Sequence, residues 1–161
     1  MPLEICYKAG IKVYRDSDAH MLTGSRIGLS FYHNQYFRII IDDSQIITRR
    51  RFTLAHELGH ILLGHLLIDT PLGRTFDDSK PHIETSADVF AARLLAPACV
   101  LWGLNLYEPE DIARFCNISL QAAAIRAERM EVLRKRGKFL TSPLERRVYK
   151  QFEDFIKNNR L

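Results

Sequence analysis

The stretch "RRRFTLAHELGHILLGHLL" (residues 49–67) constrains this chain more than any other, because it places three of the six histidines in an otherwise apolar run. Its apolar periodicity predicts one long helix from about residue 48 to residue 67. On a helix each residue turns by about 100°, so His56 and His60, four residues apart, lie about 40° apart on one face. The sequence therefore predicts a buried helix that presents two stacked imidazoles.

Two imidazoles at this spacing can bind one zinc ion through their ring nitrogens, with Glu57 beside the metal as general base, as in an H-E-x-x-H motif. The alternative is a pair of hydrogen-bonded core histidines with a surface glutamate. On a continuous helix His65 would point about 140° away from His60, so we expect it to be a helix-end histidine and not a ligand.

A catalytic zinc ion needs a third protein ligand and an open position for water. Glu84 is the candidate, twenty-four residues after His60, and Asp88 shares its helix face at i, i+4. Asp88 would accept a hydrogen bond from a ligating histidine, with His56 as the expected partner. The alternative for Glu84 is an ordinary acid in the first turn of a helix. The rival ligands are His82, Asp77 and Asp78.

The fold class that these patterns predict is α+β. Residues 26–32 and 36–41 are rich in β-branched and aromatic residues and predict an antiparallel hairpin, after a strand at 11–15. We expect 36–41 to be an edge strand that pairs with an extended substrate through Tyr36, Arg38 and Ile40. Tyr36, His82 and Tyr107 are open alternatives for the group that stabilises an oxyanion.

The C-terminal third is basic and helical. From residue 126 onward, eleven Lys/Arg stand against five Asp/Glu, an excess of +6. Residues 111–130 have the pattern of a helix-turn-helix, in which Ser119 caps the second helix, and Arg126 and Arg129 face phosphates. A solvated helical surface is the alternative to this weak nucleic-acid contact. The capping box "SPLE" (142–145) predicts a final amphipathic helix.

The motifs "RFTLAHELGH" and "E-x-x-A-D-x-F-A-A-x-L-L-x-P" together resemble the ImmA/IrrE-type zinc metallopeptidases over roughly residues 8 to 130. The resemblance implies His56, His60 and Glu84 as ligands of one Zn²⁺, and Glu57 as catalytic acid/base. It also implies a zincin-like, thermolysin-like core with a small antiparallel sheet packed on the H-E-x-x-H helix, which we place at residues 1–104. A helix-turn-helix-like region would follow at 105–161.

The resemblance further implies an endopeptidase that cleaves a helix-turn-helix transcriptional repressor. Two alternatives remain, namely the toxin of a toxin–antitoxin pair and a regulator that binds DNA or a repressor without proteolysis. The three widely spaced cysteines predict a reducing compartment. With no signal peptide and no long apolar run in view, we expect a cytoplasmic protein without a membrane partner.

Overall fold

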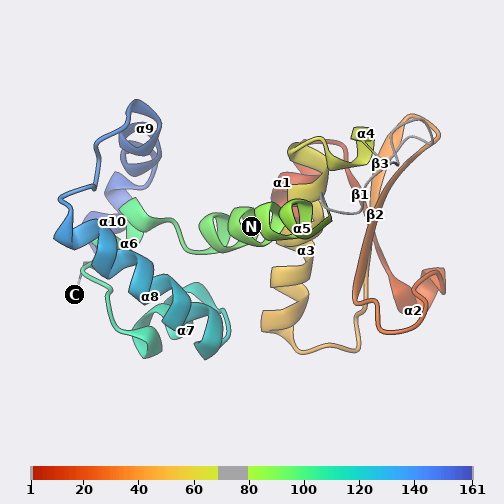
Figure 1. Cartoon of the computed structure of the whole chain (residues 1–161), viewed down its shortest axis with the longest axis horizontal. Coiled ribbons are helices and arrows are strands. Elements are labelled where there is room, and N and C mark those ends of the chain that lie inside the picture. Colours follow the sequence, from red (N-terminus) through yellow and green to blue (C-terminus); the bar gives the residue numbers. More distant parts are fainter. Residues whose placement is uncertain (1, 69–79, 161) are drawn as a thin grey trace. The chain divides into compact units, whose positions relative to one another are not determined.

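The computed structural model describes residues 2–68 and 80–160 (Figure 1). The chain forms two compact units, Met1–Ala91 and Ala92–Leu161, each with its own core. The sequence placed a boundary after residue 104, whereas this division falls inside helix α5 (Lys80–Leu95). Residues 92–104 therefore belong with the C-terminal unit.

The sheet of the first unit has three strands in the order β1 (Lys12–Arg15), β3 (Tyr36–Ile41), β2 (Gly28–His33). The predicted hairpin is confirmed, since β2 and β3 pair antiparallel from Gly28–Ile41 to His33–Tyr36. Its two turn residues, Asn34 and Gln35, both have positive φ, as a tight hairpin turn requires.

Two predictions about this sheet are wrong. β1 pairs with β3 in parallel, so the sheet is mixed and not antiparallel. β3 has a strand on each side, so it is central, and its backbone hydrogen-bonding groups are already used. Among the described residues, β2 and β1 are the strands with one neighbour each.

Helix α3 (Ile47–Leu62) carries the H-E-x-x-H sequence and packs against β2 and β3. Its inner face buries Leu54, Ala55 and Leu58 against a core that includes Ile39 and Ile40 of β3. The predicted continuation to residue 67 is wrong. The helix stops at Leu62, Gly64 takes a φ of 76°, and a separate turn α4 (His65–Ile68) begins.

Two short helices complete the first unit, α1 (Pro2–Lys8) and α2 (Asp16–Ala19). α1 packs against α3 and buries Cys6 completely. The first part of α5 packs on α3 through small residues, because the Cα of Ala87 lies only 3.4 Å from where a Cβ on Gly59 would be. Such a close approach of two helices lets their polar side chains meet.

The second unit is helical: α6 (Ala98–Gly103), α7 (Pro109–Cys116), α8 (Leu120–Lys135), α9 (Pro143–Gln151) and α10 (Glu153–Asn159). Its core includes Leu101, Leu104, Ile112, Met130 and Ile156.

Two helix starts in this unit are confirmed. Ser119 accepts a hydrogen bond from the backbone N–H of Ala122, and Ser142 accepts one from Glu145. The expected single last helix is instead interrupted at Phe152, which separates α9 from α10.

Helices α7 and α8 pack together and are joined by a short turn in which Asn117 has a φ of 51°. This local arrangement is a helix, a turn and a helix, whereas a helix-turn-helix in the DNA-binding sense stays a prediction for 111–130. It leaves Arg129 exposed but buries Arg126, which is 8% exposed. Arg126 therefore does not lie on an open surface that could meet a duplex.

Residues 82–103 are long and apolar enough to be a candidate membrane span, with a mean hydropathy of 1.2. Buried core helices pass the same test. Here the stretch comprises most of α5 and all of α6, which Pro97 separates. It also carries Glu84, Asp88 and Arg93, and it contributes buried side chains to the cores of both units.

Candidate metal centre

Three hydrogen-bond acceptors converge where α3 meets the first half of α5. Nε2 of His56 lies 2.9 Å from Nε2 of His60, and Glu84 Oε2 lies 3.3 Å from the first and 3.7 Å from the second. Such groups repel one another unless a cation or a shared proton lies between them. The geometry is therefore compatible with a cation site.

The donor set fits zinc. A tetrahedral ion with bonds of about 2.0–2.1 Å holds its ligand atoms about 3.3 Å apart, which is the middle of the observed range. Two imidazole nitrogens and one carboxylate oxygen are also the ligand types of a catalytic zinc site with one open position. The three ligand atoms all lie within 4.8 Å of one another.

Asp88 lies behind His56. Its Oδ1 is 2.8 Å from Nδ1 of His56, so the imidazole can donate its proton there and leave Nε2 as a lone pair directed at the cation site. Glu84 and Asp88, one turn apart on α5, thus contact the two nitrogens of the same ring. The sequence predicted this partner for His56; its effect on a bound metal remains a prediction.

His60 is held in a neutral state. Burial lowers its pKa, and the neighbouring His56 lowers it further, while Glu84 and Asp88 act in the opposite direction. A neutral imidazole is the form that ligates metal. Its imidazole is therefore already in the form that ligates metal near neutral pH.

Glu57 lies beside the three acceptors and is 9% exposed, on the side of α3 that faces the sheet. Burial raises the pKa of its carboxyl, and hydrogen bonding from Ser30 of β2 lowers it in part. Gly28 of the same strand gives the carboxylate room, because a Cβ there would lie 2.9 Å from Oε1 of Glu57. A buried carboxylate of raised basicity next to a cation site can accept a proton from water.

The predicted direction of His65 is wrong. Because the chain turns at Gly64, His65 folds back and its Nδ1 lies 3.2 Å from Nδ1 of His60. Its Nε2 lies 3.3 Å from the hydroxyl of Ser86 on α5. His65 is thus a partner of His60, as Asp88 is of His56. Gly64, near the end of the predicted helix, is the sequence signal from which this contact could have been predicted.

The predicted substrate-binding residues are not gathered at this centre. Ile40 is 1% exposed and belongs to the core, so it cannot contact a substrate. The ring of Tyr36 lies under Lys12 Nζ at 4.2 Å and lines a pocket with residues of α1 and β1. Arg38 lies on the central strand, and its Nε is buried without a partner in the described structure.

The rival ligands do not join the cluster either. His82 is exposed in the first turn of α5 and is not among the grouped ligand atoms, while Asp77 and Asp78 lie outside the described residues. Tyr107, proposed as one oxyanion donor, belongs to the second unit. The described residues that meet around one point are His56, His60 and Glu84.

A pair of imidazoles and a carboxylate around one point, with a buried glutamate beside it, is typical of metal-dependent hydrolases. Residues 6–128 match the M78 peptidase family, described as the IrrE N-terminal-like domain, and the chain belongs to this family. The resemblance noted from the sequence motifs is thereby confirmed. A search of curated proteins finds no match.

Proposed function

We propose that this M78-family protein is a zinc-dependent endopeptidase with His56, His60 and Glu84 as metal ligands and Glu57 as general acid/base. The observation that carries the proposal is the convergence of two Nε2 atoms and one carboxylate oxygen on a single point. Zinc bound there would supply a Lewis acid for a peptide carbonyl and would acidify a water molecule.

The protein's own residues supply the remaining chemistry. Glu57, buried and of raised pKa, accepts the proton of the attacking water and passes it to the leaving amine nitrogen. Asp88 keeps the proton of His56 on Nδ1, and His65 fixes the ring of His60. Each residue thus has a role that follows from its contacts.

The edge of β2 that faces away from β3 is the supported place for a substrate. Among the described residues this strand pairs with β3 alone, and Gly28 at its start lies against Glu57. An extended segment that adds to β2 would carry its peptide bonds past the general base. This favours a substrate with an unfolded linker over one cleaved within a packed domain.

For the substrate itself we propose a cytoplasmic helix-turn-helix repressor, cleaved at an exposed site so that repression is relieved. The support is the family to which the chain belongs and the resemblance on which the expectation rests. The preference for an extended segment fits the linker that joins a DNA-binding domain to its partner domain.

The metal assignment is tested by elemental analysis of the purified protein. We expect about one zinc per chain, lost in His56→Ala and in Glu84→Ala but kept in Glu57→Gln. Retention of full zinc by Glu84→Ala would exclude Glu84 as the third ligand. The control is Glu108→Ala, an acid of the second unit outside the metal cluster.

The peptidase assignment is tested by incubating the zinc-loaded protein with candidate repressors and mass-analysing the products. Wild type should release a discrete fragment, and Glu57→Gln should lose about 10²-fold or more of the rate. Equal release of intact repressor from DNA by both proteins would instead establish regulation by binding alone.

A further inference from the structure

The second unit contains a pocket of about 640 Å³ whose walls carry an unusual excess of cations. Five of its lining residues are basic, and one is acidic: Arg93, Arg126, Arg129, Arg136 and Lys138, against Glu145. All lie within residues 92–161, so the pocket belongs to one compact unit. It contains none of the residues of the metal centre.

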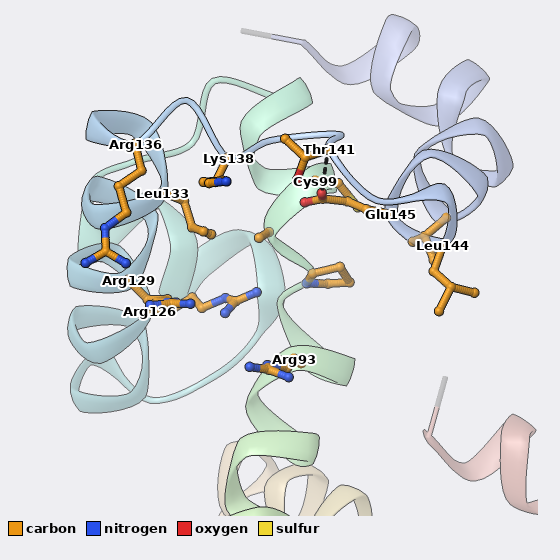
Figure 2. A pocket seen from close by; sticks show the side chains of 13 residues that line it. Arg93, Cys99, Arg126, Arg129, Leu133, Arg136, Lys138, Thr141, Leu144 and Glu145 are labelled. Atoms are coloured by element: carbon orange, nitrogen blue, oxygen red, sulfur yellow. Dashed lines mark hydrogen bonds between the residues drawn. The ribbon is translucent and has the colours of Figure 1, made fainter.

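Within this cluster, Arg126 is both buried and fixed in its orientation. It is 8% exposed, and its Nε donates a 2.7 Å hydrogen bond to the backbone carbonyl of Ala96. That contact fixes the plane of the guanidinium. Within residues 2–68 and 80–160 no carboxylate forms an ion pair with its guanidinium. Figure 2 shows Arg126 extending from α8 into the hollow, with Arg93 approaching from α5.

A buried and uncompensated positive charge is costly. Burial, together with the charge of Arg93, lowers the pKa of Arg126 to about 10, so the group stays protonated at neutral pH. Glu145 offsets only one of the five positive charges, and its Oε2 accepts a hydrogen bond from the backbone N–H of Thr141, just before α9. The positive potential of the pocket is thus available to a ligand.

We propose that this pocket binds a small molecule that carries a diphosphate or triphosphate group. Guanidinium groups bind phosphate oxygens through paired hydrogen bonds, and several cations around one hollow match several adjacent negative charges. The volume is in the range of ligand pockets for small molecules. Apolar side chains of Leu133, Leu144 and Val148 line the same hollow and offer a surface to the non-phosphate part.

The buried position of Arg126 favours a small ligand over duplex DNA. Phosphates of a duplex are contacted by cations that project from an accessible surface. Here Arg126 is recessed, and the pocket includes residues from α5, the α5–α6 junction, α8 and the start of α9. A short, flexible polyphosphate can enter such a hollow, whereas a duplex backbone cannot.

The test is calorimetric titration of the full-length protein with inorganic triphosphate and with ATP at fixed ionic strength. We expect saturable binding of one triphosphate group per chain. Arg93→Gln and Arg129→Gln should each weaken it about 10- to 100-fold, because each loses a charge-assisted hydrogen bond. Both side chains are exposed, so neither change should affect folding. Arg126 is left intact, because it also holds the carbonyl of Ala96.

Arg147→Gln is the matched control. It removes the same charge from an exposed position of α9 that does not line the pocket, and it should change the affinity less than about twofold. ATP could bind more tightly than triphosphate, and Leu144→Ser could reduce that difference. This result would show that the nucleoside contacts the apolar wall of the pocket. Absence of saturable binding, or equal weakening by all three Gln variants, would overturn the proposal. Duplex DNA binding that depends on Arg93 and Arg129 without triphosphate binding would also overturn it.

Discussion

Gly28→Ala should lower the peptidase rate and leave zinc binding unchanged, although it adds only one methyl group. Gly28 begins β2 and faces α3, and a Cβ there would overlap the Cγ2 methyl of Thr53 and lie 2.9 Å from Oε1 of Glu57. The Thr53 side chain is β-branched and 5% exposed, so it cannot easily rotate away. The carboxylate of Glu57 is the group that can move.

The magnitude follows from these two contacts. Overpacking of this kind costs about 1–3 kcal/mol of unfolding free energy. A displacement of Glu57 by about 1 Å should cost about 10²-fold in peptidase rate. The metal ligands are not touched by the new methyl group, so zinc content should be unchanged.

The assay combines urea unfolding, zinc analysis and rate measurement on Gly28→Ala, Thr53→Ser and the double variant. Thr53→Ser removes the methyl that the new Cβ would meet, so the double variant should recover about 1 kcal/mol relative to additivity. Its activity should stay low, because the contact with Glu57 remains. Wild-type stability and rate in Gly28→Ala, or strict additivity in the cycle, would refute the packing argument.

Three further changes give sharp expectations. Asp88→Asn should weaken zinc binding about 10- to 100-fold in a chelator competition, because a neutral amide oxygen replaces the carboxylate that accepts the Nδ1 proton of His56; unchanged affinity would remove the role of that charge. His65→Phe should keep the ring volume yet weaken zinc binding in the same assay, because His60 loses its Nδ1 partner; equal affinity would make His65 a space filler. Burial raises the pKa of the Cys6 thiol above the ordinary 9.0, so the folded state holds its proton longer than the unfolded chain does. This contribution to stability is complete below pH 9 and is lost as the pH rises further, so the difference in urea-unfolding free energy between wild type and Cys6→Ala should narrow as the pH rises above 9; a constant difference would contradict it.

Local signals in the sequence predicted much of this structure. The hairpin was visible because both strands are β-branched and aromatic, with a short polar turn between them. Ser119 and Ser142 marked two helix starts, since their hydroxyls accept backbone N–H groups within the same turn. The facing imidazoles of His56 and His60 followed from helical spacing alone.

What failed depended on contacts distant in sequence or on one backbone torsion. The parallel pairing of β1 places it beside β3 and turns an expected edge strand into a central one. The positive φ of Gly64 reverses the direction of His65, which a continuous helix would have pointed away. The basic pocket could not be read from local sequence, because Arg93 comes from α5 and only the fold brings it to Arg126 and Arg129 of α8.

The metal centre also bears on the topology of the chain. His60 and Glu84 are twenty-four residues apart in the sequence, so an ion that binds both closes a loop of that length by coordination. Closing such a loop in the unfolded chain costs about 3 kcal/mol of entropy. An ion bound only by the folded chain would therefore act as a reversible crosslink that ties α5 to α3. Chelation would then cut that crosslink, and the attachment of one helix would depend on the metal supply of the cell.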